Sequence, residues 1–367
     1  MLHATHSPTL APNETGSREL TLNVIYTRGT VRSLSLFIWS MLDHADCRFR
    51  LVANGCTSEE MAFLRRLAAH SPRLSFLALP TKLVMLHGQA LNYLQARTDG
   101  DRFGFLDSDI IAAERLPATL LAPLAECTMR CCFPASVIIG PDLDPMTALV
   151  EPLCCTYLAV YDNHALTAFI RSTGIGFDKY LWSEIPGQYQ QQLTGLGLER
   201  ARYDTAQLLT LLLANPDQRP WIVPADGLVH IGGFSQITGK TDPSRMTAIK
   251  RAVHRLPGAR LQDAMMSVIE MFRPRRQHGG TEPEWEARRR YHGQKKVVSR
   301  YFGALFDALI AGDRLPDPPR TTDSRLDGRV RRATCAIVAS FEKHGVRHTT
   351  GIHPDFYQRR PSLDGSC

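Results

Sequence analysis

Strands and helices alternate along the chain after a polar start, and this alternation restricts the possible fold more than any other feature. β-branched and apolar runs typical of buried strands lie at 20–27, 49–55, 74–80 and 102–107. Apolar residues at helical spacing lie between them, at 30–42, 57–70 and 88–97. Such alternation implies parallel strands joined by right-handed crossovers. The sequence therefore predicts an α/β fold with a mostly parallel central sheet.

The rhythm changes after about residue 130. Further strands are predicted at 131–139, 152–161, 221–223 and 227–231, with helices at 163–172 and 203–215. Beyond residue 240 the sequence indicates helices at 263–272, 295–312 and 328–343, separated by basic or Pro-rich loops. We therefore expect a polar tail at 1–19, an α/β domain at 20–240 and a helical, basic region at 241–367.

The chain lacks the patterns of export or membrane insertion. Its first twenty residues have no basic start followed by an apolar core, and no later run reaches the roughly 18 apolar residues of a membrane span. Nine cysteines form no paired CxxC spacing, which favours reduced thiols over zinc or disulfides. We expect a cytoplasmic protein.

The formal net charge of +7 comes mainly from one segment. Residues 273–300 contain nine Lys or Arg against three Glu. Three interpretations stay open: a solvated face, an electrostatic patch for an anionic acceptor or a membrane leaflet, and a nucleic-acid site, which is the least favoured. Among possible partners of this segment, we keep a membrane surface, which residues 273–300 would contact peripherally.

The stretch "RFGFLDSDII" places two carboxylates, Asp107 and Asp109, at the end of a predicted strand. Asp is depleted in strands, and two like charges so close together are unfavourable unless something neutralises them. A divalent cation such as Mg²⁺ or Mn²⁺ takes oxygen ligands of this kind. The pattern alone is common, however, and it also fits a solvated loop.

Several stretches together resemble the GT-A glycosyltransferases, most closely the family-2-like inverting enzymes. These are the strand-helix opening, the turn Asn54–Gly55–Cys56–Thr57, "HGQALNYLQA", "FLDSDI" and "DGLVHIGGFS". The resemblance runs from about Leu20 to Ser235. It implies a GT-A α/β/α sandwich with a mixed, mostly parallel sheet and a helical C-terminal extension. A nucleotide-binding half would occupy 20–112, and an acceptor half 113–240.

The resemblance also implies roles for the acidic residues and one histidine. Asp109 would be the main ligand of Mn²⁺ or Mg²⁺, Asp107 would contact the ribose or a metal-bound water, and His230 would be a further ligand. Asp204 would be the general base, with Asp162, Asp178 and Glu184 as competing candidates. Asp204 and Gln207 also have capping-box-like spacing, so a purely structural role is the alternative.

The same resemblance suggests a donor site at the strand ends. Tyr26 would stack on the base, Asn54 would bind its edge, and Arg28 would screen phosphate charge. His87, Gly88 and Asn92 would lie beside the sugar and ribose. Relatives often carry Asp near Asn54, so the identity of the base stays open.

These features predict a metal-dependent transferase that moves a sugar from a nucleotide sugar to an acceptor hydroxyl with inversion. A UDP-sugar is favoured over GDP- or dTDP-sugars, and the acceptor would be a glycan, a lipid-linked glycan or a small molecule. One alternative is a non-catalytic GT-A-like binding or scaffold protein that acts through its basic C-terminal region. The other, a sugar-nucleotidyltransferase, is disfavoured because "YTRGTVRSL" is a poor match to a Gly-rich phosphate loop.

Overall fold

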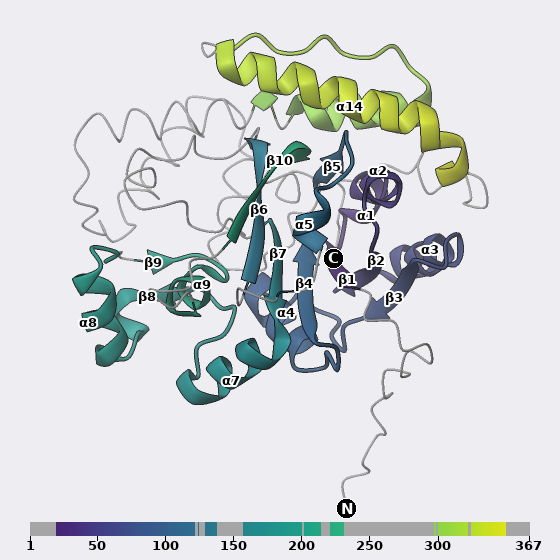
Figure 1. Cartoon of the computed structure of the whole chain (residues 1–367). Helices are drawn as coiled ribbons and strands as arrows, with labels where there is room; N and C mark the ends of the chain where they lie inside the picture. The colour runs from purple at the N-terminus through teal and green to yellow at the C-terminus, as the bar shows by residue number, and fades with distance from the viewer. Residues whose placement is uncertain are drawn as a thin grey trace, which may run out of the picture.

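The computed structural model is an α/β structure built around one eight-stranded sheet (Figure 1). The strand order is β3-β2-β1-β4-β7-β6-β10-β5. The structure describes residues 20–121, 124, 129–137, 157–199, 202–213, 221–230, 297–298, 300–321 and 324–349.

Four parallel strands form the first half of the sheet. They are β1 (Thr21–Thr27), β2 (Arg48–Asn54), β3 (Leu74–Ala78) and β4 (Arg102–Leu106). Short helices α1 (Val31–Leu34) and α2 (Phe37–His44), together with α3 (Ser58–Ala69) and α4 (His87–Gln95), connect them. All four parallel strands end at the same edge of the sheet, where ligands of open α/β sheets gather.

Local sequence signals account for most of these elements. The Thr57 hydroxyl accepts the backbone N–H of Glu60, and the Glu60 carboxylate accepts the backbone N–H of Thr57, which is the predicted capping box at the start of α3. The prediction of one continuous helix at 30–42 is wrong. The structure breaks it at Ser35 and Leu36, where serines of low helix propensity cluster.

The second half of the sheet mixes strand directions. It contains β5 (Ile110–Ala112), β6 (Met129–Val137), β7 (Leu158–Asp162) and β10 (Trp221–His230). β7 runs antiparallel to β4 and β6, and β5 runs antiparallel to β10. The strands predicted at 221–223 and 227–231 are one strand, whose pairing with β6 shifts between Ala225 and Val229. The mixed, mostly parallel sheet predicted from the resemblance is confirmed.

Smaller elements surround the second half. They are α5 (Ala118–Leu121), α7 (Asn163–Thr173), the 3-10 turn η1 (Trp182–Glu184), α8 (Gly187–Gly195) and α9 (Gln207–Leu213). A two-stranded sheet pairs β8 (Tyr180–Leu181) with β9 (Arg202–Tyr203).

Side chains of the central sheet point alternately into two apolar layers. Leu51 and Val160 pack with α2 and α3 on one face, whereas their neighbours Val52 and Tyr161 pack with α4, α7 and α9 on the other. This alternation is the two-residue period of a strand covered on both faces. The α/β/α sandwich is therefore present as predicted.

Helical segments from the C-terminal region complete the first of these layers. Residues 300–311 are helical, and α14 (Ser324–Thr349) lies along the top of the molecule in Figure 1. Both contribute buried side chains to the core that contains α2, among them Phe302, Phe306 and Val330. The predicted tail at 1–19 and helix at 263–272 lie outside the described residues, and the predicted domain boundary at 240 stays a prediction.

Candidate metal and donor site

The two predicted metal-binding carboxylates lie in the turn between β4 and β5. The register of the sheet brings a third group to them, because His230, the last residue of β10, is paired with Ile110, which directly follows Asp109. Residues 121 positions apart in the chain thus become neighbours through strand pairing alone.

The three side chains form a compact cluster. His230 Nε2 lies 3.1 Å from Asp109 Oδ1 and 3.6 Å from Asp107 Oδ2. One ligand atom from each residue lies within 4.8 Å of the others. Asp109 and His230 are 5% and 3% exposed, whereas the Asp107 side chain keeps 25% of its surface accessible. Two buried groups therefore sit behind one that faces outward.

This cluster has the donor set and the spacing that a divalent cation requires. Ligand atoms at right angles around Mg²⁺, each about 2.0–2.1 Å from the ion, are about 3 Å apart. The two distances from His230 are close to that value, and two carboxylates with one imidazole suit Mn²⁺ or Mg²⁺. The residues present fit the ion that the sequence predicts.

Electrostatics favour a cation at the same place. Desolvation, followed by the negative charge of Asp109, raises the pKa of Asp107 to about 7, and Asp204 adds to the shift. His230 opposes it. Without a positive partner, Asp107 thus resists ionisation, so a divalent cation would relieve the repulsion between the two carboxylates.

Tyr157 contacts two members of the cluster, and no sequence pattern predicted this role. Its backbone carbonyl accepts the backbone N–H of Asp107 at 2.7 Å. Its ring lies against the imidazole of His230, with centroids 4.0 Å apart and the planes at 42°. One residue just before β7 therefore restrains both ends of the cluster.

A second group of polar side chains lies near the first. Burial, then the charge of Lys179, lowers the pKa of His87 to about 4, while Asp204 and Asp109 act in the opposite direction. His87 is therefore a neutral imidazole near pH 7. The charges of Lys179, Asp204 and Asp109 therefore all act on His87, and Asp204 also acts on Asp107.

Asp204 is exposed and paired with a cation. Its side chain is 70% exposed, and its Oδ1 lies 2.5 Å from the Lys179 ammonium. The Gln207 side chain accepts the backbone N–H of Asp204 at 3.0 Å, which is half of the predicted capping box at the start of α9. Lys179 was absent from the predicted site, and no pattern around it distinguishes it from a surface lysine.

The competing base candidates have structural partners of their own. Asp162 caps α7 by accepting the backbone N–H of Ala165, and Glu184 accepts that of Leu181. Asp178 accepts a hydrogen bond from the Asn92 amide at 2.7 Å.

The start of α4 is pressed against the segment that carries Asp178. An added Cβ at Gly88 would lie 2.5 Å from the Phe177 carbonyl oxygen, so only glycine fits there. Asn92 fastens the same segment, since its Oδ1 accepts the Phe177 N–H at 2.8 Å. In this structure, Gly88 and Asn92 hold protein backbone beside the site, and their predicted contacts with sugar and ribose stay predictions.

The predicted base-binding residues differ in accessibility. Tyr26 is 1% exposed and burial raises its pKa, so a nucleotide base could stack on its ring only by displacing core side chains. The buried Asn54 amide donates to the Met85 carbonyl at 3.0 Å and accepts the Met85 N–H at 2.8 Å. Arg28 is exposed at the end of β1, where a phosphate can reach it.

Glu60 links the two loops next to Arg28, a role that the capping box alone did not reveal. Besides capping α3, its carboxylate accepts the backbone N–H of Gly29 at 2.6 Å. The turn after β1 and the turn after β2 are therefore held together by one buried carboxylate.

The basic segment 273–300 lies almost entirely outside the described residues, so its predicted membrane contact stays a prediction. Among the helices that the structure describes, none has both the length and the apolar character needed to cross a bilayer.

Comparison with known proteins gives only distant similarities. No family model matches the chain, and no curated protein matches it. A search of solved structures finds the apo form of the glycosyltransferase GlyE in Streptococcus pneumoniae TIGR4, at 12% identity over 56% of this chain and 45% of that one, with a TM-score of 0.34. The chain thus spans less than half of that GlyE structure.

Two further solved structures have similar scores. The mannosyltransferase PcManGT from Pyrobaculum calidifontis, in complex with GDP-Man and Mn²⁺, is 14% identical over 94% of this chain and 86% of its own, with a TM-score of 0.40. Glucosyl-3-phosphoglycerate synthase from Mycobacterium tuberculosis, in complex with Mn²⁺, UDP-Glc and phosphoglyceric acid, is 17% identical over 58% and 71%, with a TM-score of 0.34. Similarities this low carry no argument about activity.

Proposed function

We propose that this chain is a metal-dependent glycosyltransferase, which moves a sugar from a nucleotide-sugar donor to an acceptor hydroxyl with inversion. The observation that supports the proposal most is the cluster of Asp107, Asp109 and His230 at the end of β4, whose spacing and charge suit a divalent cation. The mixed α/β sheet and the sequence resemblance to GT-A enzymes point in the same direction.

Asp109 and His230 would hold Mn²⁺ or Mg²⁺, with Asp107 as the outward-facing third ligand. When bound, the ion would supply positive charge that neutralises the departing nucleoside diphosphate. The buried pair keeps its ligand atoms fixed, because Tyr157 packs against the imidazole and strand pairing holds the backbone. Asp107 keeps 25% of its side-chain surface accessible, so it would be the ligand that also contacts the ribose or the diphosphate.

Asp204 would act as the general base. Its carboxylate takes the proton of the acceptor hydroxyl as that oxygen forms a bond to the anomeric carbon, and the bond from this carbon to the diphosphate oxygen breaks, its electron pair leaving with the diphosphate. Lys179 holds the carboxylate in place through the 2.5 Å ion pair. The neutral His87 imidazole offers hydrogen bonding to the donor without adding charge.

The donor nucleotide would lie over the turns after β1 and β2. Arg28 would screen its phosphates, and Glu60 keeps the two turns together beneath it. A UDP-sugar remains the favoured donor, and the acceptor would be a glycan, a lipid-linked glycan or a small molecule. Cytoplasmic location with peripheral membrane contact belongs to the same proposal.

The proposal is tested by calorimetric titration of the protein with UDP, GDP and dTDP, each with Mn²⁺ or with EDTA. We expect one nucleotide to bind only with Mn²⁺, and Asp109→Asn to remove this binding. Asp101→Asn is the matched control, because Asp101 is exposed and precedes β4 at the opposite edge of the sheet. Metal-independent binding, or equal binding by Asp109→Asn, would overturn the metal role. No binding at all would favour the non-catalytic alternative.

The base is tested separately with Asp204→Asn. General base catalysis contributes about 10²–10⁴-fold, so we expect kcat to fall by that factor while Mn²⁺-dependent nucleotide binding is retained. Glu199→Gln is the control, because Glu199 is an exposed carboxylate between α8 and β9. A retained kcat would exclude Asp204 as the base.

A further inference from the structure

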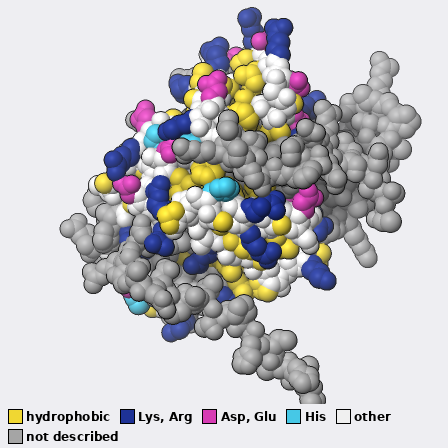
Figure 2. Space-filling model, turned by 90° about the vertical axis from the view of Figure 1, so that its right-hand side faces the viewer, with side chains coloured by type: hydrophobic (Ala, Val, Ile, Leu, Met, Phe, Trp, Pro, Cys, Tyr) yellow, Lys and Arg dark blue, Asp and Glu magenta, His cyan; other side chains and the backbone are white. Residues whose placement is uncertain are grey.

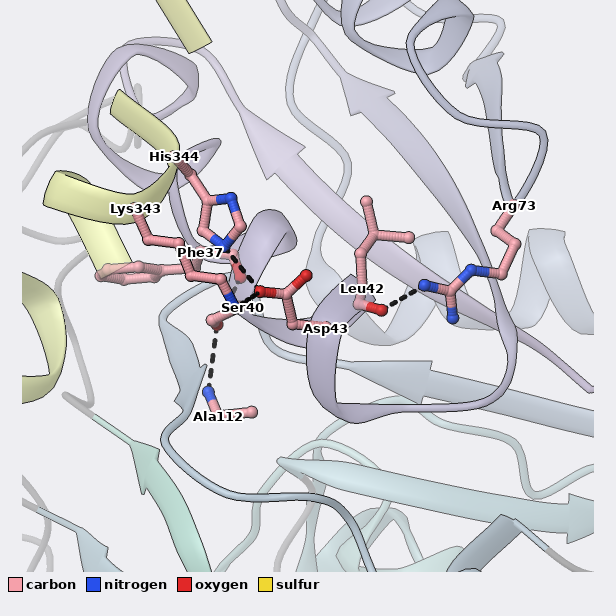
Figure 3. Close-up of polar contacts among 8 residues, drawn as sticks. All are labelled: Phe37, Ser40, Leu42, Asp43, Arg73, Ala112, Lys343 and His344. Atoms are coloured by element: carbon pink, nitrogen blue, oxygen red, sulfur yellow. Dashed lines mark hydrogen bonds and ion pairs between the residues drawn. The ribbon is translucent and has the colours of Figure 1, made fainter. Parts of the chain in front are cut away.

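The segment that directly follows Asp109 is attached at three points to helix α2 and to the turn after it. The Ser40 hydroxyl accepts the backbone N–H of Ala112 at 3.1 Å (Figure 3). The His44 carbonyl accepts the backbone N–H of Leu116 at 2.8 Å. Arg115 also forms an ion pair with Asp46, which lies in the turn after α2. Because β5 begins directly after Asp109, the placement of that carboxylate depends on where α2 lies.

Helix α2 is in turn fastened to the C-terminal helix α14. Asp43 Oδ2 lies 2.8 Å from His344 Nε2 and also pairs with the Lys343 ammonium, as Figure 3 shows. His344 is only 3% exposed, and its ring stacks on Trp39 of α2 with centroids 6.0 Å apart. Ser40 and Asp43 are three residues apart, so they lie on neighbouring positions of the same helix surface.

The charge on Asp43 is maintained by its partners on α14. Burial on its own raises the pKa of Asp43, but hydrogen bonds and charges from Lys343 and His344 outweigh it, and the pKa is lowered. The opposite side of α2 is also restrained, because Arg73 donates to the carbonyls of Leu42 and Ala45 at the end of the helix. Helix α2 is thus held between two anchors.

We propose that Asp43 is a positioning residue for the metal site. Because Asp43 holds α2 against α14, it also fixes the position of residues 110–116, which are hydrogen-bonded to α2, and of the adjacent Asp109. The position of α14 then affects the metal site, and any ligand or partner that displaces α14 lowers metal affinity. The inference rests on the proposed function only in taking Asp109 as a metal ligand.

Three variants separate the links of this chain of contacts. Asp43→Asn removes the charge at constant shape, Lys343→Ala removes one exposed partner, and Ser40→Ala removes the acceptor of the Ala112 N–H. Asp307→Asn is the matched control. Asp307 also forms an ion pair between the C-terminal region and the first half of the chain, at 3.4 Å, but its partner Arg32 belongs to α1 and not to α2.

Two measurements are made on each variant of the full chain: hydrogen exchange of the segment 110–116, and Mn²⁺ affinity by calorimetry. We expect Asp43→Asn and Ser40→Ala to accelerate exchange at 110–116 and to weaken Mn²⁺ binding by about 3-fold to 30-fold, the range for residues along a connected network. Lys343→Ala should act in the same direction more weakly. The Asp43→Asn/Ser40→Ala double variant should show less than the combined effect, because both act through one link.

The proposal is overturned if Asp43→Asn changes exchange at 110–116 no more than Asp307→Asn does, or if Mn²⁺ affinity stays at the wild-type value. A wild-type chain that binds no Mn²⁺ would overturn the proposed metal site and, with it, the effect of Asp43 on metal affinity. The exchange measurement would then still decide whether Asp43 positions residues 110–116.

Discussion

At the scale of single residues, two aspartates and one histidine carry most of the function we propose, and their environments differ. Asp109 is buried next to His230, whereas Asp107 is partly exposed and resists ionisation. Burial therefore fixes the position of the Asp109 carboxylate, whereas the charge of Asp107 depends on whether a cation is bound. It also makes the affinity of the site depend on pH.

The raised pKa of Asp107 predicts how both fold stability and Mn²⁺ affinity change with pH. An Asp whose folded pKa is about 7, against an ordinary value of 3.8, destabilises the metal-free fold increasingly as pH rises from about 4 to about 7. Mn²⁺ binds the ionised carboxylate, so its affinity should rise by about tenfold between pH 6 and pH 8 and then level off. Thermal shift with and without Mn²⁺ across this range measures the effect.

Asp107→Asn provides the control for this pH dependence. The amide cannot titrate, so the stabilisation by Mn²⁺ should become smaller and independent of pH between 6 and 8. A variant that keeps the wild-type slope would assign the dependence to another group.

The sequence predicted the roles of residues that form short local patterns. It did not predict the roles of residues that reach the site only through contacts distant in the chain. The pair Asp107/Asp109 and the capping box of Thr57 are visible in a few consecutive letters. Tyr157 and Lys179 have no such pattern, because strand pairing and loop packing alone bring them to the site.

At the scale of secondary-structure elements, the first half of the sheet was predictable because each strand and helix has its own start and stop signals. The break between α1 and α2 has a local signal in its serines, but the apolar spacing at 30–42 conceals it. The continuity of β10 was not predictable, because it depends on pairing with β6, which the sequence does not specify locally. The C-terminal helix at 328–343 was predicted, but its contact with α2 depends on single polar residues of ordinary composition.

The docking of α4 gives a prediction at this scale. Gly88→Ala would place a Cβ within 2.5 Å of the Phe177 carbonyl oxygen, so either α4 or residues 177–178 must move. We expect a loss of about 1–3 kcal/mol in the free energy of unfolding, together with weaker donor binding, because His87 is the adjacent residue. Chemical denaturation and nucleotide titration measure the two effects.

Gly303→Ala is the matched control for this variant. Gly303 is also helical, and a Cβ there would meet nothing within 4 Å. Alanine should therefore leave stability unchanged or raise it by about 0.5–1 kcal/mol. If Gly88→Ala behaved like Gly303→Ala, the close packing of α4 against residues 177–178 would be contradicted.

At the scale of the whole molecule, the C-terminal region shares its core with the sheet domain. The surface in Figure 2 shows basic and acidic side chains interspersed with apolar areas, so the described side chains of this face are mixed in sign. The excess positive charge resides instead in the sequence 273–300. The predicted division at residue 240 separates stretches of different composition, while the apolar layer beneath α14 is continuous across it.

This continuity predicts that the sheet domain does not fold by itself. Ten side chains from the described C-terminal residues are buried in the core that contains α2: Val298, Tyr301, Phe302, Leu305, Phe306, Leu309, Leu326, Val330, Ala333 and Ile337. At about 1.5–3 kcal/mol for each larger side chain, their removal equals or exceeds the 5–15 kcal/mol that usually stabilises a fold. A chain ending at residue 296 should therefore aggregate or bind hydrophobic dyes, without a cooperative unfolding transition.

In the full chain, Phe302→Ala should lower the free energy of unfolding by about 3–5 kcal/mol, whereas Leu315→Ala, at an exposed position, should leave it nearly unchanged. A shortened chain that unfolds cooperatively with near wild-type stability would show instead that the sheet domain is independent and that α14 is only attached to it.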